Sequence, residues 1–235
     1  RSTMTMYLTK QGAAELVAEL RRTVPNKNQL SVKEVEVAMK KLEQACEFMA
    51  CDANARQSLW VAKIHHTLGH WLKAIVARAP INDPNSELLY LVCNALQNLI
   101  QLQTGDCRAG IGDQALGALA ALTLSQGDHD AECVEGALKL FASLFSGVTA
   151  GADSQKHLKK KFFGLQPDGS VKADDETAIP CLQMLRDPAL LLCEARTFQS
   201  QVALCDVLVR APRPPPSWPR ASSPHAHSNL HPRAP

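Results

Sequence analysis

Apolar residues recur at intervals of three and four along most of the chain, the spacing of one face of an α-helix. A clear run is made by Val35, Ala38, Leu42, Ala45 and Met49. No run rich in β-branched and aromatic residues, as strands would require, interrupts the pattern. The sequence therefore predicts an all-α fold.

Capping residues, prolines and glycines indicate where the helices begin and end. Ser31 and Glu34 have the spacing of a capping box. Asp83-Pro84 and Asp187-Pro188 each place an N-cap before a proline at the first helical position. A Gly-rich turn is expected at 105–112 and a polar loop at 165–176. The predicted helices cover residues 10–22, 31–50, 55–78, 84–103, 113–124, 128–146, 154–163, 178–186 and 188–209.

The last of these helices has a long apolar face, which we expect to point into the core. This face consists of Leu191, Ala195, Phe198, Val202 and Cys205.

Strong helix starts near residues 31, 84, 128 and 188 recur at intervals of about 45–60 residues, with a second helix between most of them. This is the rhythm of helix-pair repeats. An irregular helical bundle is the alternative that the same pattern allows.

The capped helix pairs, the Leu- and Ala-rich inner faces and the turns Asn82-Asp83-Pro84 and Asp187-Pro188 resemble armadillo and HEAT-type α-solenoids across about residues 10–210. The resemblance implies irregular helix-pair repeats stacked as a short α-solenoid that binds proteins on its concave face. Large eukaryotic scaffolds with irregular repeats, among them centriolar and meiotic proteins, are of this kind. Helices 84–103 and 128–146 are then expected to line the binding surface.

The chain divides into a helical-repeat domain, residues 1–210, and a tail rich in Pro, Ser, His and Arg, residues 211–235. The tail has eight prolines, and Leu230 is its only aliphatic residue larger than Ala. It cannot bury enough apolar surface to offset the entropy of folding, so we expect disorder. The abrupt change after Arg210, and a first residue that is not Met, suggest a fragment or a splice product.

Charge gives no whole-domain signature of a nucleic-acid binder. The chain has 25 Lys and Arg against 23 Asp and Glu, and three of the arginines lie in the tail. The body is therefore close to neutral. No apolar stretch approaches the ~20 residues that a membrane-spanning helix needs, so we expect no membrane association.

Eight cysteines occur without a Cys-x-x-Cys pair or a signal peptide. A chain of this size does not need disulfides to hold its core. The cysteines are interpreted as buried free thiols of an intracellular protein, cytoplasmic or nuclear.

His66 and His70 have the i, i+4 spacing of a two-histidine metal pair. Thr67, however, stands where a zinc protease needs Glu, and spacing indicates no third ligand. We expect surface or half-buried histidines beside Trp71, and no metal site.

Residues 110–115 match the dinucleotide-binding pattern G-x-G-x-x-A, with Gly110, Gly112 and Ala115. That loop requires a preceding strand, whereas a predicted helix and a polar turn precede this one. A helix–helix connection is expected, and no cofactor. The acidic run 174–176 lacks the alternating ligands of a calcium loop.

Lys156, Lys159, Lys160 and Lys161 form a basic patch next to Phe162-Phe163. Such a patch can contact phosphate groups or an acidic partner. The alternative is a solvated helix end, where lysines are favoured by the helix dipole.

No Ser-His-Asp or Cys-His arrangement stands out, so the sequence predicts no catalytic residue and no enzyme. The predicted function is a non-enzymatic scaffold that binds one or more partner proteins through a helical-repeat surface. The alternative is a helical-repeat nucleic-acid-binding protein that uses the basic patch at 156–163.

Overall fold

The computed structural model describes residues 8–24, 32–77, 85–102, 105–146, 152–166, 168, 170, 172 and 175–213. These residues are helical or irregular and contain no β-strand, which confirms the all-α prediction. The helices are α1 (Lys10–Thr23), α2 (Val32–Cys51), α3 (Ala53–Val61), α4 (Ile64–Val76), α5 (Asn85–Ile100), α6 (Gly105–Leu124), the 3-10 helix η1 (Gln126–Asp128), α7 (Ala131–Leu144), α8 (Ala152–Phe163), α9 (Ala178–Arg186), α10 (Pro188–Glu194) and α11 (Phe198–Arg210).

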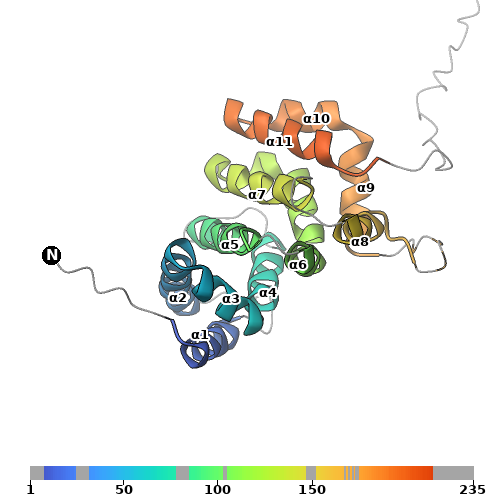
Figure 1. Cartoon of the computed structure of the whole chain (residues 1–235). Helices are drawn as coiled ribbons and strands as arrows, with labels where there is room; N and C mark the ends of the chain where they lie inside the picture. Colours follow the sequence, from blue (N-terminus) through green and yellow to red (C-terminus); the bar gives the residue numbers. More distant parts are fainter. Residues whose placement is uncertain are drawn as a thin grey trace, which may run out of the picture.

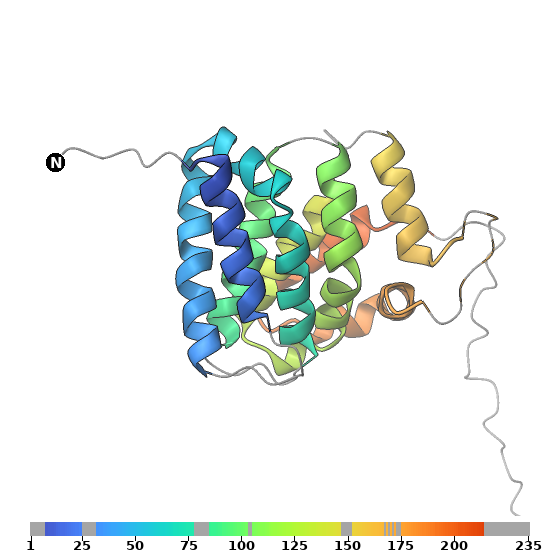
Figure 2. The same ribbon diagram turned by 90° about the horizontal axis from the view of Figure 1, so that it is seen from below.

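The helices form two layers (Figure 1). In the first layer α1, α2, α5, α7 and α11 follow one another, and each packs on the next. In the second layer α4 packs on α6, and α6 packs on α8 and α9. Figure 2 shows α1, α4, α6 and α8 side by side with similar directions, whereas α9 is seen nearly end-on. The layers meet where α4 contacts α5 and α6 contacts α7.

One continuous aliphatic core, dominated by Leu and Ala, joins the two layers. Its largest fully buried side chains are Trp71, Phe141, Phe162 and Phe163. Each helix contributes an apolar face, so the stack forms by burial of these faces rather than by helix propensity alone.

The single helix predicted over 55–78 is wrong, because the chain forms α3 and α4 there. The break lies at Ala62 and Lys63, and Lys63 has a left-handed backbone conformation with φ 62°. Asp52 caps the start of α3 by accepting a hydrogen bond from the amide of Asn54.

The Gly-rich turn predicted at 105–112 is also wrong, because these residues are the first half of α6. Gly110 and Gly112 among them are contact positions. A Cβ at Gly110 would lie 2.8 Å from Cη2 of Trp60, and one at Gly112 would overlap the side chain of Leu158. The absence of side chains lets α3 and α8 approach α6 closely.

The helix predicted over 188–209 is two helices, α10 and α11. The chain leaves the helical conformation at Ala195, and Thr197 caps α11 by accepting a hydrogen bond from the amide of Ser200. Because α11 starts anew at Phe198 instead of continuing α10, the face of α11 that is buried differs from the predicted one.

The inward face predicted for this helix is therefore correct in its first half only. Leu191 and Ala195 are buried, but Phe198, Val202 and Cys205 are exposed. The buried face of α11 consists instead of Ser200, Ala203, Leu204 and Val207.

The start predicted at 128 lies three residues early. Asp130 is the N-cap of α7, and its carboxylate accepts from the amides of Glu132 and Cys133. The capping box at Ser31, the Asp83-Pro84 start and residues 214–235 of the tail lie outside the described residues.

Candidate protein-binding surface

Two grooves lie along the first layer. The α5–α7 groove encloses about 390 Å³. The α7–α11 groove encloses about 690 Å³. Glu135 and Lys139 of α7 line both, so the grooves adjoin. They lie along α5 and α7, the helices that the sequence predicts as the lining of a binding surface.

The lining of the α5–α7 groove consists mainly of polar and charged residues and includes Gly136 on α7. Tyr90 on α5 is half exposed (50%) and forms one wall. An added Cβ at Gly136 would make an ordinary van der Waals contact with Tyr90 Cδ2, at 3.9 Å, so a methyl group fits there without a clash. Gln97 donates a hydrogen bond to the hydroxyl of Ser143, 2.9 Å away, and ties α5 to α7.

The α7–α11 groove is mainly apolar. Phe198 (75% exposed), Val202 (51%) and Val209 (79%) belong to its lining. Large apolar side chains that cluster on a surface are typical of interaction sites.

Ion pairs neutralise much of the charge along these grooves. Lys139 Nζ lies 2.5 Å from Glu135 Oε1, and Arg210 Nε lies 2.5 Å from Asp206 Oδ1. Ion pairs between solvent-accessible side chains contribute little to stability, so breaking them to meet a partner's charged groups costs little.

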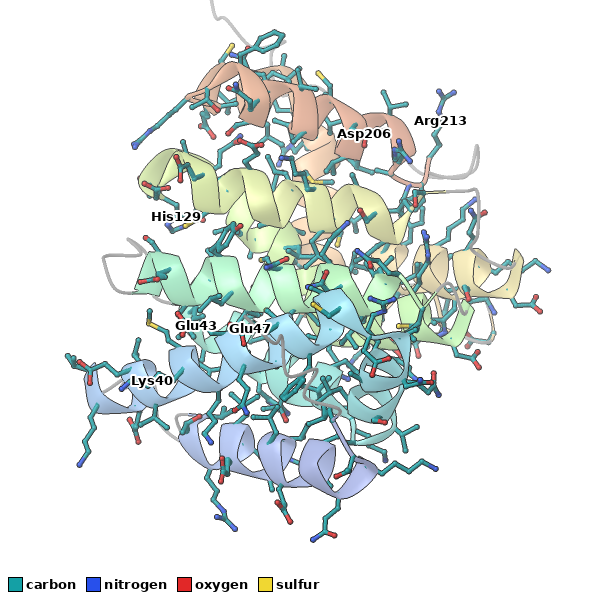
Figure 3. The ribbon with its side chains drawn as sticks, turned by 60° about the vertical axis from the view of Figure 1, so that its left-hand side comes forward. Lys40, Glu43, Glu47, His129, Asp206 and Arg213 are labelled. Atoms are coloured by element: carbon teal, nitrogen blue, oxygen red, sulfur yellow. The ribbon has the colours of Figure 1, made fainter. Side chains whose placement is uncertain are left out.

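Acidic residues of α2 continue this surface beyond α5. Figure 3 shows Lys40, Glu43 and Glu47 on α2 and Asp206 on α11, within one ladder of helices. Cys46, next to the two glutamates, donates from its Sγ to the carbonyl of Leu91 on α5, 3.8 Å away. Burial, with the nearby carboxylates, raises the pKa of Cys46 to about 11.

The predicted basic patch lies on α8, which packs on α6 in the second layer (Figure 1). Lys156, Lys159 and Lys160 are exposed, and Lys161 is half-buried. Lys156 Nζ is 3.7 Å from Asp153 Oδ1.

Phe162 and Phe163 beside this patch are fully buried and belong to the core. Their rings lie edge to face, with centroids 5.3 Å apart. They cannot stack on nucleic-acid bases without unfolding α8, because single-strand recognition needs exposed aromatic rings.

Of the three histidines of α4, His65 and His66 have ring centroids 4.4 Å apart. His65 is buried, and burial, followed by the charge of His66, lowers its pKa to about 4. His66 is half-buried and His70 is exposed. Within the described part of the chain, no group of three or more His, Cys, Asp or Glu residues could hold a metal ion.

Gly110, Gly112 and Ala115 of the dinucleotide-like pattern all lie inside α6. Helix backbone amides there are paired within the helix, so this segment is not a phosphate-binding loop.

All eight cysteines are free thiols, and five of them are buried. Burial raises the pKa of Cys133 to about 11 and that of Cys93 and Cys107 to about 12. Cys51, Cys193 and Cys205 are exposed.

The sequence did not indicate that Tyr90, Gly136 and Val209 line the grooves. An isolated glycine in an apolar helix was the only local signal for Gly136. For the other two, exposure depends on which distant helices lie alongside.

No family model, curated protein or solved structure matches this chain. Within the described residues, no helix combines the length and the apolar composition needed to cross a bilayer.

Proposed function

We propose that this chain is a non-enzymatic scaffold that binds a segment of a partner protein along the face formed by α5, α7 and α11. The observation that supports this most directly is the pair of adjoining grooves, one polar and one apolar, that share Glu135 and Lys139. An elongated surface of this kind suits a helix or an extended peptide.

The apolar groove would supply most of the binding free energy. Covering Phe198, Val202 and Val209 removes apolar surface from water, which contributes ~25 cal/mol per Å² before the costs of association. Tyr90 and the charged rim would supply specificity, since buried tyrosines and polar rims are typical of protein interfaces.

The two-layer stack supports a proposal that the domain is an armadillo or HEAT-type α-solenoid. Successive helices of each layer pack on their neighbours, from α2 to α5 to α7 to α11 and from α4 to α6 to α9. In solenoids this arrangement creates extended surfaces for partner proteins.

Filling the α5–α7 groove tests the proposal. Gly136→Gln places a side chain in the groove against Tyr90 and replaces a glycine inside a helix, so the fold should not be weakened. In quantitative affinity capture, we expect proteins that bind the native chain to be absent or reduced among those captured by this variant. Gly127→Gln, whose Cβ would meet no atom within 4 Å, is the control. Equal retention by both variants and the native chain would overturn the proposal.

A second candidate, nucleic-acid binding by α8, is favoured by the exposure of Lys156, Lys159 and Lys160. It predicts a gel shift at low salt that is lost when Lys159, Lys160 and Lys161 are all replaced by Glu. The scaffold proposal predicts no such shift. It also predicts that the triple variant captures the same partner proteins as the native chain.

A further inference from the structure

We infer that the α5–α7 groove is an arginine-binding site, in which a guanidinium group of the bound segment stacks on Tyr90 and pairs with Glu132. The inference rests on the proposed function, because it names the chemistry of the segment that this groove binds. The groove would then select its partner by a basic residue as well as by apolar contacts.

The first turns of α5 and α7 lie against each other. The Sγ of Cys133 on α7 donates to the carbonyl of Ser86 on α5, 3.0 Å away. Glu87 and Glu132 are the acidic residues of these two first turns, and both are exposed. Two carboxylates from different helices therefore lie at the end of the groove where α5 and α7 begin.

Tyr90 lies close to both carboxylates. It follows Glu87 by three residues, which makes the two side chains neighbours on the surface of α5. Across the groove, a Cβ at Gly136 would lie 3.9 Å from Cδ2 of Tyr90, and Glu132 lies about one turn before Gly136 on α7. The tyrosine side chain is half exposed, so a ligand in the groove can reach the ring.

The charge of Glu132 is not compensated by the rest of the groove. Glu132 forms no ion pair with another described residue. The neighbouring Glu135 is paired with Lys139, whose Nζ lies 2.5 Å from Oε1. The lining of the groove therefore has a net negative charge, and that charge belongs to Glu132.

Acidic residues of α2 extend the negative charge beyond α5. Glu43 and Glu47 of α2 outnumber Lys40 on the same helix (Figure 3). Their carboxylates, after burial as the main cause, raise the pKa of Cys46, whose Sγ donates to the carbonyl of Leu91 on α5. A basic segment is attracted to such a face, whereas an acidic one is repelled.

A guanidinium group fits these features better than other side chains do. It is a permanent cation with N–H donors in a planar fork, so it can lie on an aromatic ring while it donates to a carboxylate. Stacking on tyrosine adds a cation–π attraction. Lysine provides a point charge without the planar contact, so we expect it to bind more weakly.

Gln97 provides a hydrogen-bond acceptor further along the same groove. Its Nε2 donates to the hydroxyl of Ser143, 2.9 Å away, but its buried Oε1 accepts no hydrogen bond within the described part of the chain. Gln97 lies about two turns after Tyr90 on α5. Since an extended chain rises ~3.3 Å per residue, a backbone N–H about three residues from the arginine would come beside this oxygen.

Titration of the full chain with a defined peptide, followed by NMR, tests the inference. The probe is a single arginine flanked by glycines on both sides. The chain carries isotope-labelled tyrosine, which gives signals from Tyr7 and Tyr90 only. We expect the ring signals of Tyr90 to shift with a millimolar Kd that rises with salt, while those of Tyr7 stay unchanged.

Matched peptides separate the charge of the probe from its shape. Citrulline has nearly the shape of arginine without its charge, so its peptide should cause no shift. The lysine peptide should bind more weakly, and a glutamate peptide should not bind. Equal shifts with citrulline or lysine would overturn the assignment to arginine. Tyr90 signals that the arginine peptide leaves unchanged would overturn it as well.

Two variants of equal charge change locate the site. Glu132→Gln should weaken binding about threefold, because it removes the uncompensated carboxylate. Glu176→Gln is the control, since Glu176 is exposed and lies just before α9 in the second layer. It should leave Kd unchanged. Equal losses in the two variants would reflect net charge alone and contradict a site formed by Tyr90 and Glu132.

The titration and the Gly136→Gln capture experiment can fail independently. If Gly136→Gln abolishes capture but the arginine peptide does not bind, the groove binds a segment of different chemistry and only this inference falls. If the peptide binds at Tyr90 but capture is unchanged by Gly136→Gln, the groove binds arginine without retaining a partner protein, and the proposed function falls.

Discussion

The imidazole of His65 in α4 stacks on the indole of Trp60 in α3, with ring centroids 3.9 Å apart and ring planes inclined by 21°. The two residues lie on either side of the break at Lys63. This contact folds α4 back on α3 and buries the imidazole, whose Nδ1 has no hydrogen-bond partner among the described residues.

Stability should fall with acid because of this histidine. The pKa of His65 is lowered from 6.5 to about 4, mainly by burial. The unfolded chain therefore binds the proton more readily, and stability present above pH 6.5 is lost as the pH falls toward 4. We expect a loss of about 3 kcal/mol from this group. Urea unfolding between pH 7 and 4 measures it.

His65→Phe is the control for that titration, because it keeps the aromatic contact with Trp60 and removes the ionisable group. The pH dependence should become shallower without vanishing, since burial also lowers the pKa of His66 and His129. An unchanged slope in His65→Phe would show that His65 is not responsible.

Two glycines inside helices should respond oppositely to the same substitution. A Cβ at Gly69 would overlap the side chain of Gln114 and lie 3.3 Å from its backbone Cα and O, so Gly69→Ala should destabilise the crossing of α4 and α6 by about 1–3 kcal/mol. A Cβ at Gly136 would make only an ordinary contact with Tyr90, at 3.9 Å, so Gly136→Ala should stabilise by ~0.5–1 kcal/mol. Thermal unfolding of both variants checks this, and a stabilised Gly69→Ala would contradict the close crossing.

A buried arginine holds the C-terminal end of α7. Arg108 on α6 donates from Nη1 to the carbonyls of Ser143 and Ser146, at 2.7 and 2.8 Å. Arg108→Met should destabilise the chain by about 1–3 kcal/mol, because it leaves these carbonyls without that donor. Arg210→Met, which removes only an exposed ion pair, should lose less than about 1 kcal/mol. Equal losses in denaturant unfolding would contradict this difference.

The eight thiols should fall into two reactivity classes. Cys51, Cys193 and Cys205 are exposed, and the other five are buried. Since the thiolate is the reactive form, burial that raises the pKa slows reaction further. A colorimetric disulfide reagent should titrate three thiols quickly in dilute solution and all eight in urea.

The same titration reports on opening of the core. Fast reaction of a buried thiol such as Cys93 would show that the core opens on that timescale.

The helical class followed from local pattern alone, and so did most helix positions. Helices at 10–22, 154–163 and 178–186 were predicted close to α1, α8 and α9. In these segments the apolar spacing, the caps and the breaking residues agree, so local signals suffice.

The wrong predictions concern segments whose structure is determined by tertiary contacts rather than by local sequence. Apolar positions continue in helical phase from Leu191 to Cys205, so no pattern marks the break before α11. It is set by the cap at Thr197 and by packing of Leu204 against the rest of the core. Similarly, glycines that are typical of turns became helix contacts in α6, because neighbouring side chains fill the space at Gly110 and Gly112.

The sequence could predict which helices line a binding surface, but not which residues form the grooves. Tyr90 and Gly136 are forty-six positions apart, and nothing in either segment indicates that they face each other. Their juxtaposition depends on the register of α5 against α7, which packing of both helices decides.

Site-specific photo-cross-linking from the α5–α7 groove tests the scaffold proposal most directly. A photoreactive phenylalanine analogue at Tyr90 should form covalent adducts with a partner protein in cells that express this chain. The same analogue at Val61, on α3, is the control. We predict adducts specific to position 90 that disappear when Gly136→Gln is added. Identical adducts from both positions, or adducts that survive Gly136→Gln, would contradict a partner-binding groove between α5 and α7.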